Sequence, residues 1–178
     1  AWWALSARER VSFARWIGLY TPKLRASRTR ALTAILAWVL VSLASIMLIG
    51  SLGEGVAASR FRGSGLAGVV PVILHAVIQT GLSEEIFFRG FLSKRLIARF
   101  GFAVGNAVQA VLFGIVHVAL FASSVSPLPL VLIGVVTAAS GWIMGWINEE
   151  CASGSILPSW MLHSAANLVV GLGAAFLA

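Results

Sequence analysis

The sequence predicts an all-α protein: a polytopic membrane helical bundle with about five transmembrane helices and an N-terminal amphipathic interfacial helix. Three observations predict this fold class. Of the 178 residues, 59% are hydrophobic and 11% are charged, whereas soluble domains carry about 25% charged residues. The mean hydropathy is +0.94. The apolar residues form uncharged runs of about 20 residues, the length that crosses a hydrocarbon core of about 30 Å.

The N-terminal region, residues 1–30, is too charged to span a membrane. Its aromatic and apolar side chains follow one helical stripe at Phe13, Trp16, Ile17 and Tyr20. This pattern predicts an amphipathic helix over residues 1–20 that lies in the membrane interface. A basic linker, Thr21–Arg30, follows it. Residues 31–178 then form the second region, the membrane-embedded bundle.

The first predicted span, Ala31–Gly50, contains no charged residue and is followed by a polar, Gly-rich loop over Ser51–Gly65. The second apolar segment, Leu66–Arg99, ends in basic residues. A span needs about 20 residues, and counting back from the basic end places the transmembrane part near 76–97. Two glutamates and one arginine of this segment then lie inside the bilayer.

Three further spans are predicted at Phe102–Phe121, Leu130–Ile147 and Ile156–Ala178. A short loop with two prolines precedes the fourth span, and an acidic stretch with a Gly/Ser turn precedes the fifth. Basic residues cluster at 23–30 and 94–99, two segments on the same side after an even number of crossings. The positive-inside rule therefore predicts a cytoplasmic N-terminus and an external C-terminus.

The charge composition argues against a nucleic-acid partner. The net charge is +7, from 13 Lys and Arg against 6 Asp and Glu. The basic residues stand at the ends of the apolar runs, where they orient spans and contact anionic headgroups. No basic face or recognised nucleic-acid-binding fold accompanies them. The single cysteine, Cys151, excludes an internal disulfide framework and any multi-cysteine metal site.

Ionisable side chains within a span are costly, so each is a candidate for function. The candidates, with one amide, are Glu84, Glu85, Arg89, His117, His163 and Asn167. Glu85 and Arg89 are four residues apart on one helix face and can pair. Glu84 is rotated by about 100° from Glu85 and lacks that partner. Adjacent carboxylates in unlike surroundings suit separate acid and base roles.

The spacing in the other spans is compatible with convergence. His163 and Asn167 are also four residues apart and project from the same face. At about 1.5 Å per residue, Glu84, His117 and His163 lie roughly 10 to 22 Å from the ends of their spans. The group can therefore meet at middle depth. His75, in contrast, lies near the end of its segment, where we expect a structural or interfacial role.

Three short motifs occur in order on successive predicted spans. They are Glu84-Glu85-Ile-Phe-Phe-Arg89, Phe113-Gly-Ile-Val-His117 and His163-Ser-Ala-Ala-Asn167. They match Glu-Glu-x-x-x-Arg, Phe-x-x-x-His and His-x-x-x-Asn, and Ser153-Gly-Ser-Ile-Leu-Pro158 resembles a Gly-Ser-x-x-x-Pro approach to the last motif. Over residues 66–170 the chain resembles the CPBP family of intramembrane proteases. That family contains the type II CAAX prenyl endopeptidases and the bacterial Abi-like membrane proteases.

The resemblance implies a membrane-embedded peptidase of the glutamate type. Glu84 would be the general base that activates water, and His117 would orient that water. His163 and Asn167 would stabilise the oxyanion, and Glu85 with Arg89 would be a supporting pair.

The resemblance also implies an environment for the reaction. The substrate would be a membrane-anchored peptide or protein, cut in a C-terminal or leader segment, and no cofactor or metal is expected. The compact chain suggests a bacterial inner-membrane protein. The sequence does not indicate an oligomeric state.

Three other functions are compatible with buried Glu and His. A zinc-dependent membrane peptidase could use Glu84, His117 and His163 as ligands, although no His-Glu-x-x-His helix is present. A transporter or proton relay also uses buried ionisable groups, but the sequence shows no internal repeat. A non-catalytic membrane binding or immunity protein could retain the motifs.

Overall fold

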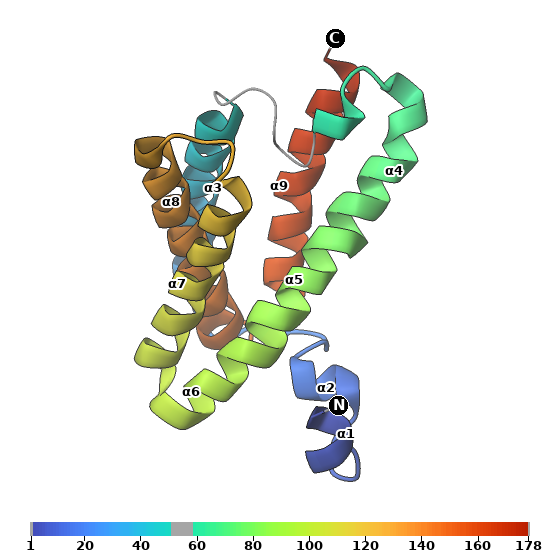
Figure 1. Ribbon diagram of the computed structural model, residues 1–178. Coiled ribbons are helices and arrows are strands. Elements are labelled where there is room, and N and C mark those ends of the chain that lie inside the picture. Colours follow the sequence, from blue (N-terminus) through green and yellow to red (C-terminus); the bar gives the residue numbers. More distant parts are fainter. Residues whose placement is uncertain (1, 51–58, 178) are drawn as a thin grey trace.

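The computed structural model describes residues 2–50 and 59–177. This part of the chain is helical and contains no strand (Figure 1). Five of its helices are long and apolar enough to cross a membrane: Arg28–Leu48, Gly65–Phe100, Phe102–Phe121, Pro127–Cys151 and Leu157–Phe176. The predicted all-α, multi-pass membrane architecture is thus confirmed. Most of the predicted loop at 51–65, namely residues 51–58, lies outside the described residues.

Three of the predicted spans have nearly the predicted bounds, and a fourth begins earlier than predicted. Helix α3 (Arg28–Gly50) begins three residues early, and α7 (Phe102–Phe121) and α9 (Leu157–Phe176) are close to the predicted spans. The fourth helix, α8 (Pro127–Trp146), includes the two prolines that were expected in a loop. Proline is well tolerated in a first helical turn, where its missing N–H has no intrahelical partner.

The second span is much longer than 76–97, because it runs continuously over Gly65–Phe100. We call it the motif helix. It consists of η2 (Gly65–Gly68), α4 (Val69–Ile73), η3 (Leu74–Leu82), α5 (Ser83–Glu85), η4 (Ile86–Ser93) and α6 (Lys94–Phe100). Both η3 and η4 are π-helical. Such turns are rare and often occur at functional sites, because they change which residues share a face.

The motif helix runs between two sets of helices (Figure 1). On one side α7 and α8 approach closely: a Cβ added at Gly114 would lie 2.5 Å from the carbonyl oxygen of Gly134. On the other side α9 packs against η3, where a Cβ at Gly81 would lie 2.6 Å from the Ser164 hydroxyl. Small residues permit such close helix packing in lipid. The shared core is formed by Trp38, Phe88, Phe113 and Met144.

The N-terminal region forms two short helices, α1 (Trp2–Ser6) and α2 (Phe13–Ile17), instead of one helix over residues 1–20. The Ser12 hydroxyl caps the start of α2, and Gly18 ends it with a φ of 86°. Ile17 of the predicted stripe is 1% exposed. It packs against Gly90 of the motif helix, so this segment is docked on the bundle.

Candidate active site

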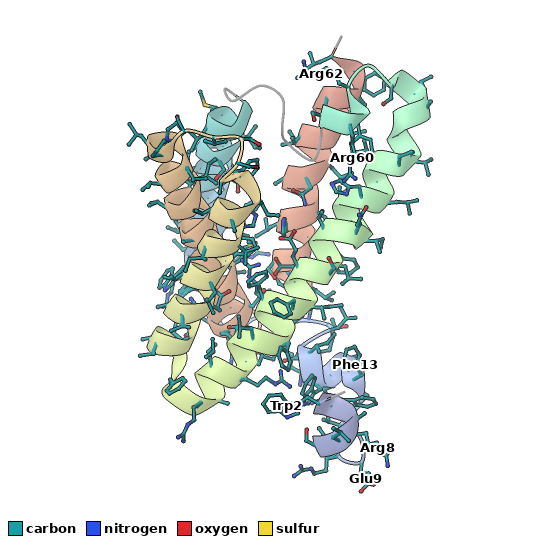
Figure 2. All side chains as sticks on the ribbon, in the orientation of Figure 1. Trp2, Arg8, Glu9, Phe13, Arg60 and Arg62 are labelled. Atoms are coloured by element: carbon teal, nitrogen blue, oxygen red, sulfur yellow. The ribbon has the colours of Figure 1, made fainter. Side chains whose placement is uncertain are left out.

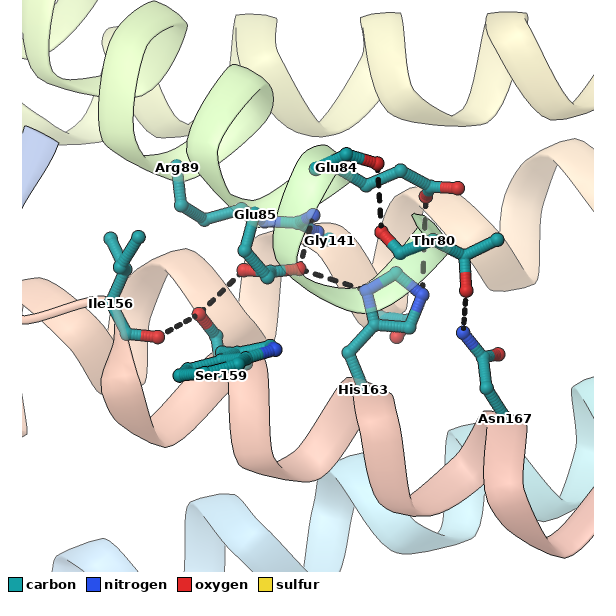
Figure 3. A network of polar contacts seen from close by, with 12 residues as sticks. Thr80, Glu84, Glu85, Arg89, Gly141, Ile156, Ser159, His163 and Asn167 are labelled. Atoms are coloured by element: carbon teal, nitrogen blue, oxygen red, sulfur yellow. Dashed lines mark hydrogen bonds and ion pairs between the residues drawn. The ribbon is translucent and has the colours of Figure 1, made fainter. Parts of the chain in front are cut away.

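Glu85 is the most completely bonded of the candidate residues. Its side chain is fully buried, and Arg89 Nη1 donates to its Oε1 over 2.9 Å. The Ser159 hydroxyl donates to Oε2 over 2.5 Å, and His163 Nδ1 lies 3.0 Å from Oε1 (Figure 3). The structure therefore contains the Glu85–Arg89 pair that the spacing predicts. Both carboxylate oxygens are already occupied by partners.

Glu84 has very different surroundings. Its side chain is 30% exposed, yet its Oε2 atom is buried and has no hydrogen-bond partner among the described residues. The nearest charged or titratable contact is His163, whose Nε2 is 3.9 Å from Oε2. That distance is too long for a hydrogen bond. One helical turn thus carries two different carboxylates. Glu85 has hydrogen-bond partners on both oxygens, whereas Glu84 has an oxygen without a partner among the described residues.

The imidazole of His163 stands between the two glutamates. An ionised carboxylate can only accept hydrogen bonds, so Nδ1 carries the proton that faces Glu85. In the neutral ring, Nε2 then holds the lone pair that faces Glu84. The contact with Glu85 therefore fixes both the orientation and the tautomer of His163.

Helix α7 brings His117 towards the same place. His117 Nδ1 donates to the carbonyl oxygen of Phe113 over 2.9 Å, which leaves Nε2 as the acceptor in the neutral ring. The Phe113 ring has centroid distances of 4.4 Å to His117 and 6.2 Å to His163. Phe113 therefore contacts both imidazoles, and His163 in turn faces Glu84. The three spans thus bring Glu84, His117 and His163 together.

Asn167 lies one helical turn beyond His163 on the same face of α9. Its Nδ2 donates to the Thr80 hydroxyl over 2.8 Å (Figure 3). That hydroxyl donates to the carbonyl oxygen of His75 over 2.9 Å. An amide group has two N–H donors. One donor of Asn167 thus orients the side chain, and the second is left for another acceptor.

A protein-family model described as Type II CAAX prenyl endopeptidase Rce1-like matches residues 66–169, which is more than half of the chain. The chain belongs to this family. The resemblance of residues 66–170 to the CAAX proteases is therefore confirmed, and the Rce1-like region contains all six candidate residues. No curated protein and no solved structure matches the chain. The protein is thus a multi-pass membrane protein of a CAAX-type endopeptidase family.

The candidate site includes two polar residues that the sequence analysis missed. Asn148 Nδ2 donates to the Ser159 hydroxyl over 2.7 Å, and the Ser159 N–H donates to Asn148 Oδ1 over 3.3 Å. Ser159 precedes His163 by four residues, so helical spacing could have found it. Asn148 was predicted in a loop, but it belongs to η5 (Ile147–Cys151), a π-helical extension of α8.

Arg89 connects the candidate site to α7 and α8. Its guanidinium lies over the Phe113 ring, 4.2 Å from the centroid, which is a favourable cation–π distance. A Cβ at Gly141 would lie 3.2 Å from Nη2, so α8 approaches this group closely. The side chain is 1% exposed. A chain of contacts therefore runs from Glu85 through Arg89 to Phe113, whose ring packs against His117.

In the described part of the chain, the ionisable side chains are not arranged as a ready metal site. Within residues 2–50 and 59–177, no three His, Cys, Asp or Glu side chains are placed to hold a metal ion. Glu85 has both oxygens engaged, and Glu84 with two histidines is the set that a zinc peptidase would need.

Proposed function

We propose that this protein is an intramembrane endopeptidase that hydrolyses a peptide bond of a membrane-anchored substrate with a water activated by Glu84. One observation carries this proposal: the contrast between two adjacent carboxylates. Glu85 has partners on both oxygens, whereas Glu84 Oε2 is buried without a hydrogen-bond partner in the described part of the chain. A base must have an oxygen available for the water proton, and Glu84 is the glutamate with such an oxygen.

In the proposed reaction, Glu84 removes a proton from water while the water oxygen attacks the scissile carbonyl carbon. His117 orients the same water, because its Nδ1 is engaged by Phe113 and its Nε2 is an acceptor. The attack gives a tetrahedral intermediate with a negatively charged oxygen. When the C–N bond breaks, the proton on Glu84 passes to the leaving amine nitrogen.

The oxyanion is stabilised from α9. Asn167 supplies the N–H that is not engaged by Thr80, and a positioned donor of this kind contributes several kcal/mol, about 2.7–4, to the transition state. His163 can donate through Nε2 when its ring carries both protons. Glu85 holds the His163 ring through Nδ1, and Arg89 offsets the charge of Glu85. In this mechanism Glu85 and Arg89 position the site and do not touch the substrate.

The substrate class and the setting are part of the proposal. We propose a C-terminal or leader segment of a membrane-anchored peptide or protein. We also propose a bacterial inner-membrane location with a cytoplasmic N-terminus, as the basic clusters at 23–30 and 94–99 suggest.

The test is cleavage of a panel of membrane-tethered peptides by the purified chain in nanodiscs, with and without a metal chelator. Glu84→Gln keeps the shape of the side chain and removes the base, so cleavage should fall at least about 100-fold. Glu150→Gln is the matched control, because Glu150 is an exposed carboxylate at the end of η5.

Each outcome selects one function. Cleavage that survives the chelator and is lost in Glu84→Gln supports the proposal. Cleavage lost with the chelator and restored by zinc would replace it with the zinc-dependent mechanism. A folded protein that cuts no peptide but still binds one would indicate a non-catalytic binding or immunity protein.

A further inference from the structure

Helix α3 is the span that is least embedded in the bundle. In its most apolar stretch 6% of the residues are buried, against 22–33% in the other four spans of the described chain. Its main neighbours are α8 and η5. Trp38 is its one buried side chain among the described residues, and its indole Nε1 donates to the Ser140 hydroxyl over 3.0 Å. This contact fastens the middle of α3 to α8.

Nearer the start of α3, the two helices leave a groove of about 350 Å³ between them. Its α3 side includes Arg30, Ala34 and Ala37, and its α8 side is formed by Trp142, Ile143 and Trp146. The charged member comes from the beginning of α3, whereas the part that extends into the span is lined by small and apolar side chains. The groove therefore has a polar mouth and an apolar interior.

The mouth of the groove lies at one membrane interface. Figure 2 shows charged side chains at two ends of the molecule, with Arg8 and Glu9 at one end and Arg62 at the other. Helix α3 begins, and α8 ends, towards the end that carries Arg8 and Glu9 (Figure 1). The mouth thus faces lipid headgroups and the interior faces hydrocarbon. We propose above that this side is cytoplasmic, and cytoplasmic leaflets carry anionic lipids.

The Arg30 guanidinium is a cation without a carboxylate partner at this mouth. It stands 5.6 Å from the centroid of the Trp146 ring, a cation–π distance that holds it beside the groove. The ion pairs of the described residues involve other cations. A guanidinium binds a phosphate through short, charge-assisted hydrogen bonds. Arg25 and Arg28 add positive charge in the preceding residues. The mouth therefore favours a headgroup with a net negative charge.

Two indole groups extend the polar surface from the mouth inwards. Trp142 and Trp146 are four residues apart on α8, which is about 6 Å along its axis. An indole Nε1–H is a hydrogen-bond donor on an apolar ring, which suits the membrane interface. The headgroup layer is about 5–8 Å thick, since a bilayer of about 40–45 Å surrounds a core of about 30 Å. The two rings therefore cover the depth between a phosphate and the start of the acyl chains.

We propose that the groove between α3 and α8 binds one anionic phospholipid. Arg30 holds the phosphate, the two indoles face the glycerol esters, and one acyl chain lies along Ala34 and Ala37. Small side chains at these two positions leave room for the chain. The lipid fills the space between α3 and α8 and thereby stabilises their packing. This site is separate from Glu84, and the inference does not depend on the proposed peptidase reaction.

A second copy of the chain is a less suitable occupant. It would cover the exposed apolar side chains of α3, but it would gain nothing from a cation at the mouth. A phospholipid matches both parts of the groove, because its phosphate pairs with Arg30 and its acyl chain is apolar. The charge at the mouth therefore decides in favour of the lipid.

The test measures ligand binding to the full chain in detergent by native mass spectrometry. Three ligands are compared: phosphatidylglycerol, phosphatidylcholine with the same acyl chains, and glycerol phosphate. Phosphatidylglycerol should bind at least about 10-fold more tightly than phosphatidylcholine, which is the effect of one charged interaction. It should also raise the midpoint of thermal unfolding. Glycerol phosphate should bind at least about 100-fold more weakly than phosphatidylglycerol, because it buries no apolar surface in the groove.

Arg30→Gln should lower the affinity for phosphatidylglycerol to that for phosphatidylcholine, whereas Arg28→Gln should preserve the difference. Arg28 is the matched control, because it is an exposed arginine of the same helical turn and does not line the groove. Ala37→Leu should weaken the binding of both phospholipids, because the larger side chain occupies the path of the acyl chain. The unfolding midpoint of each variant without lipid shows that it is folded.

Several results would overturn the inference. It is wrong if the two phospholipids bind alike, or if the two arginine variants behave the same. It is also wrong if glycerol phosphate binds as tightly as phosphatidylglycerol, because the groove is then a phosphate site without an acyl chain. A lipid-free dimer that Ala37→Leu disrupts would assign the groove to a second copy of the chain.

Discussion

Ser159 gives the sharpest prediction for the stability of the site. Its hydroxyl donates to Glu85 Oε2 over 2.5 Å and accepts from Asn148 Nδ2 over 2.7 Å. Glu85 is 0% and Asn148 is 1% exposed, so neither can turn to water when the hydroxyl is removed. Ser159→Ala leaves a buried carboxylate oxygen and a buried amide without this partner.

The magnitude follows from the two contacts. A hydrogen bond to a charged group contributes about 1.5–3 kcal/mol, and one between neutral groups about 0.5–1.5 kcal/mol. We therefore expect Ser159→Ala to lower the free energy of unfolding by about 2–4 kcal/mol. For a chain of this size, the midpoint of thermal unfolding should fall by at least about 5 °C. Cleavage should fall by roughly 10-fold, because Glu85 then holds the His163 ring less firmly.

The assay is thermal unfolding in detergent, followed by cleavage at a temperature where both proteins are folded. Ser164→Ala is the matched control on the same helix. Ser164 is buried at 7% exposure, and its hydroxyl has no hydrogen-bond partner among the described residues. Equal unfolding midpoints for the two variants would refute the reasoning, since the contacts of Ser159 would then contribute nothing.

Two further predictions concern the docked N-terminal region. Gly90→Ala places a Cβ 2.7 Å from the carbonyl oxygen of Ile17, so limited proteolysis should cut the first 25 residues faster. Gly173→Ala is the control: its added Cβ would have no atom within 4 Å, so the rate should not change. Burial and the charge of Glu149 raise the pKa of the Tyr20 phenol above its usual 10.0. The folded state thus holds this proton more tightly than the unfolded chain. The protonated Tyr20 phenol contributes its full stabilisation of the folded state below about pH 10. It is lost as the pH rises through the folded value, and Tyr20→Phe should remove this alkaline fall in an unfolding titration.

The spans and the motif pairs could be predicted because their signals are local. An uncharged apolar run of about 20 residues has few alternatives to a membrane helix, and α7 agrees with its predicted bounds. The spacing of Glu85 and Arg89 predicts their ion pair in the same way. It also predicts that Glu84 lacks this ion pair, and in the structure Arg89 pairs with Glu85 while Glu84 approaches the other nitrogen of His163.

Other features depend on contacts that no local pattern contains. The π-helical turns of η3 (Leu74–Leu82) and η4 (Ile86–Ser93) look like ordinary helix in the sequence. Ser159 and Asn148 stand in segments where Ser and Asn have many uses, and only the fold brings them to Glu85. The sequence could not predict that the N-terminal stripe packs against Gly90. A glycine has no side chain that would mark it as a docking partner, and the contact depends on the close approach of its backbone.

The central claim is that adjacent Glu84 and Glu85 have different tasks: Glu84 keeps an oxygen without a hydrogen-bond partner for the attacking water, and Glu85 supports the site. The most direct test is the single-turnover rate of peptide cleavage for Glu84→Gln and Glu85→Gln, each measured where its unfolding curve shows a folded protein. The account predicts that Glu84→Gln abolishes cleavage with little change in stability. Glu85→Gln should lower the unfolding midpoint and leave measurable cleavage. Normal cleavage by Glu84→Gln would contradict the account.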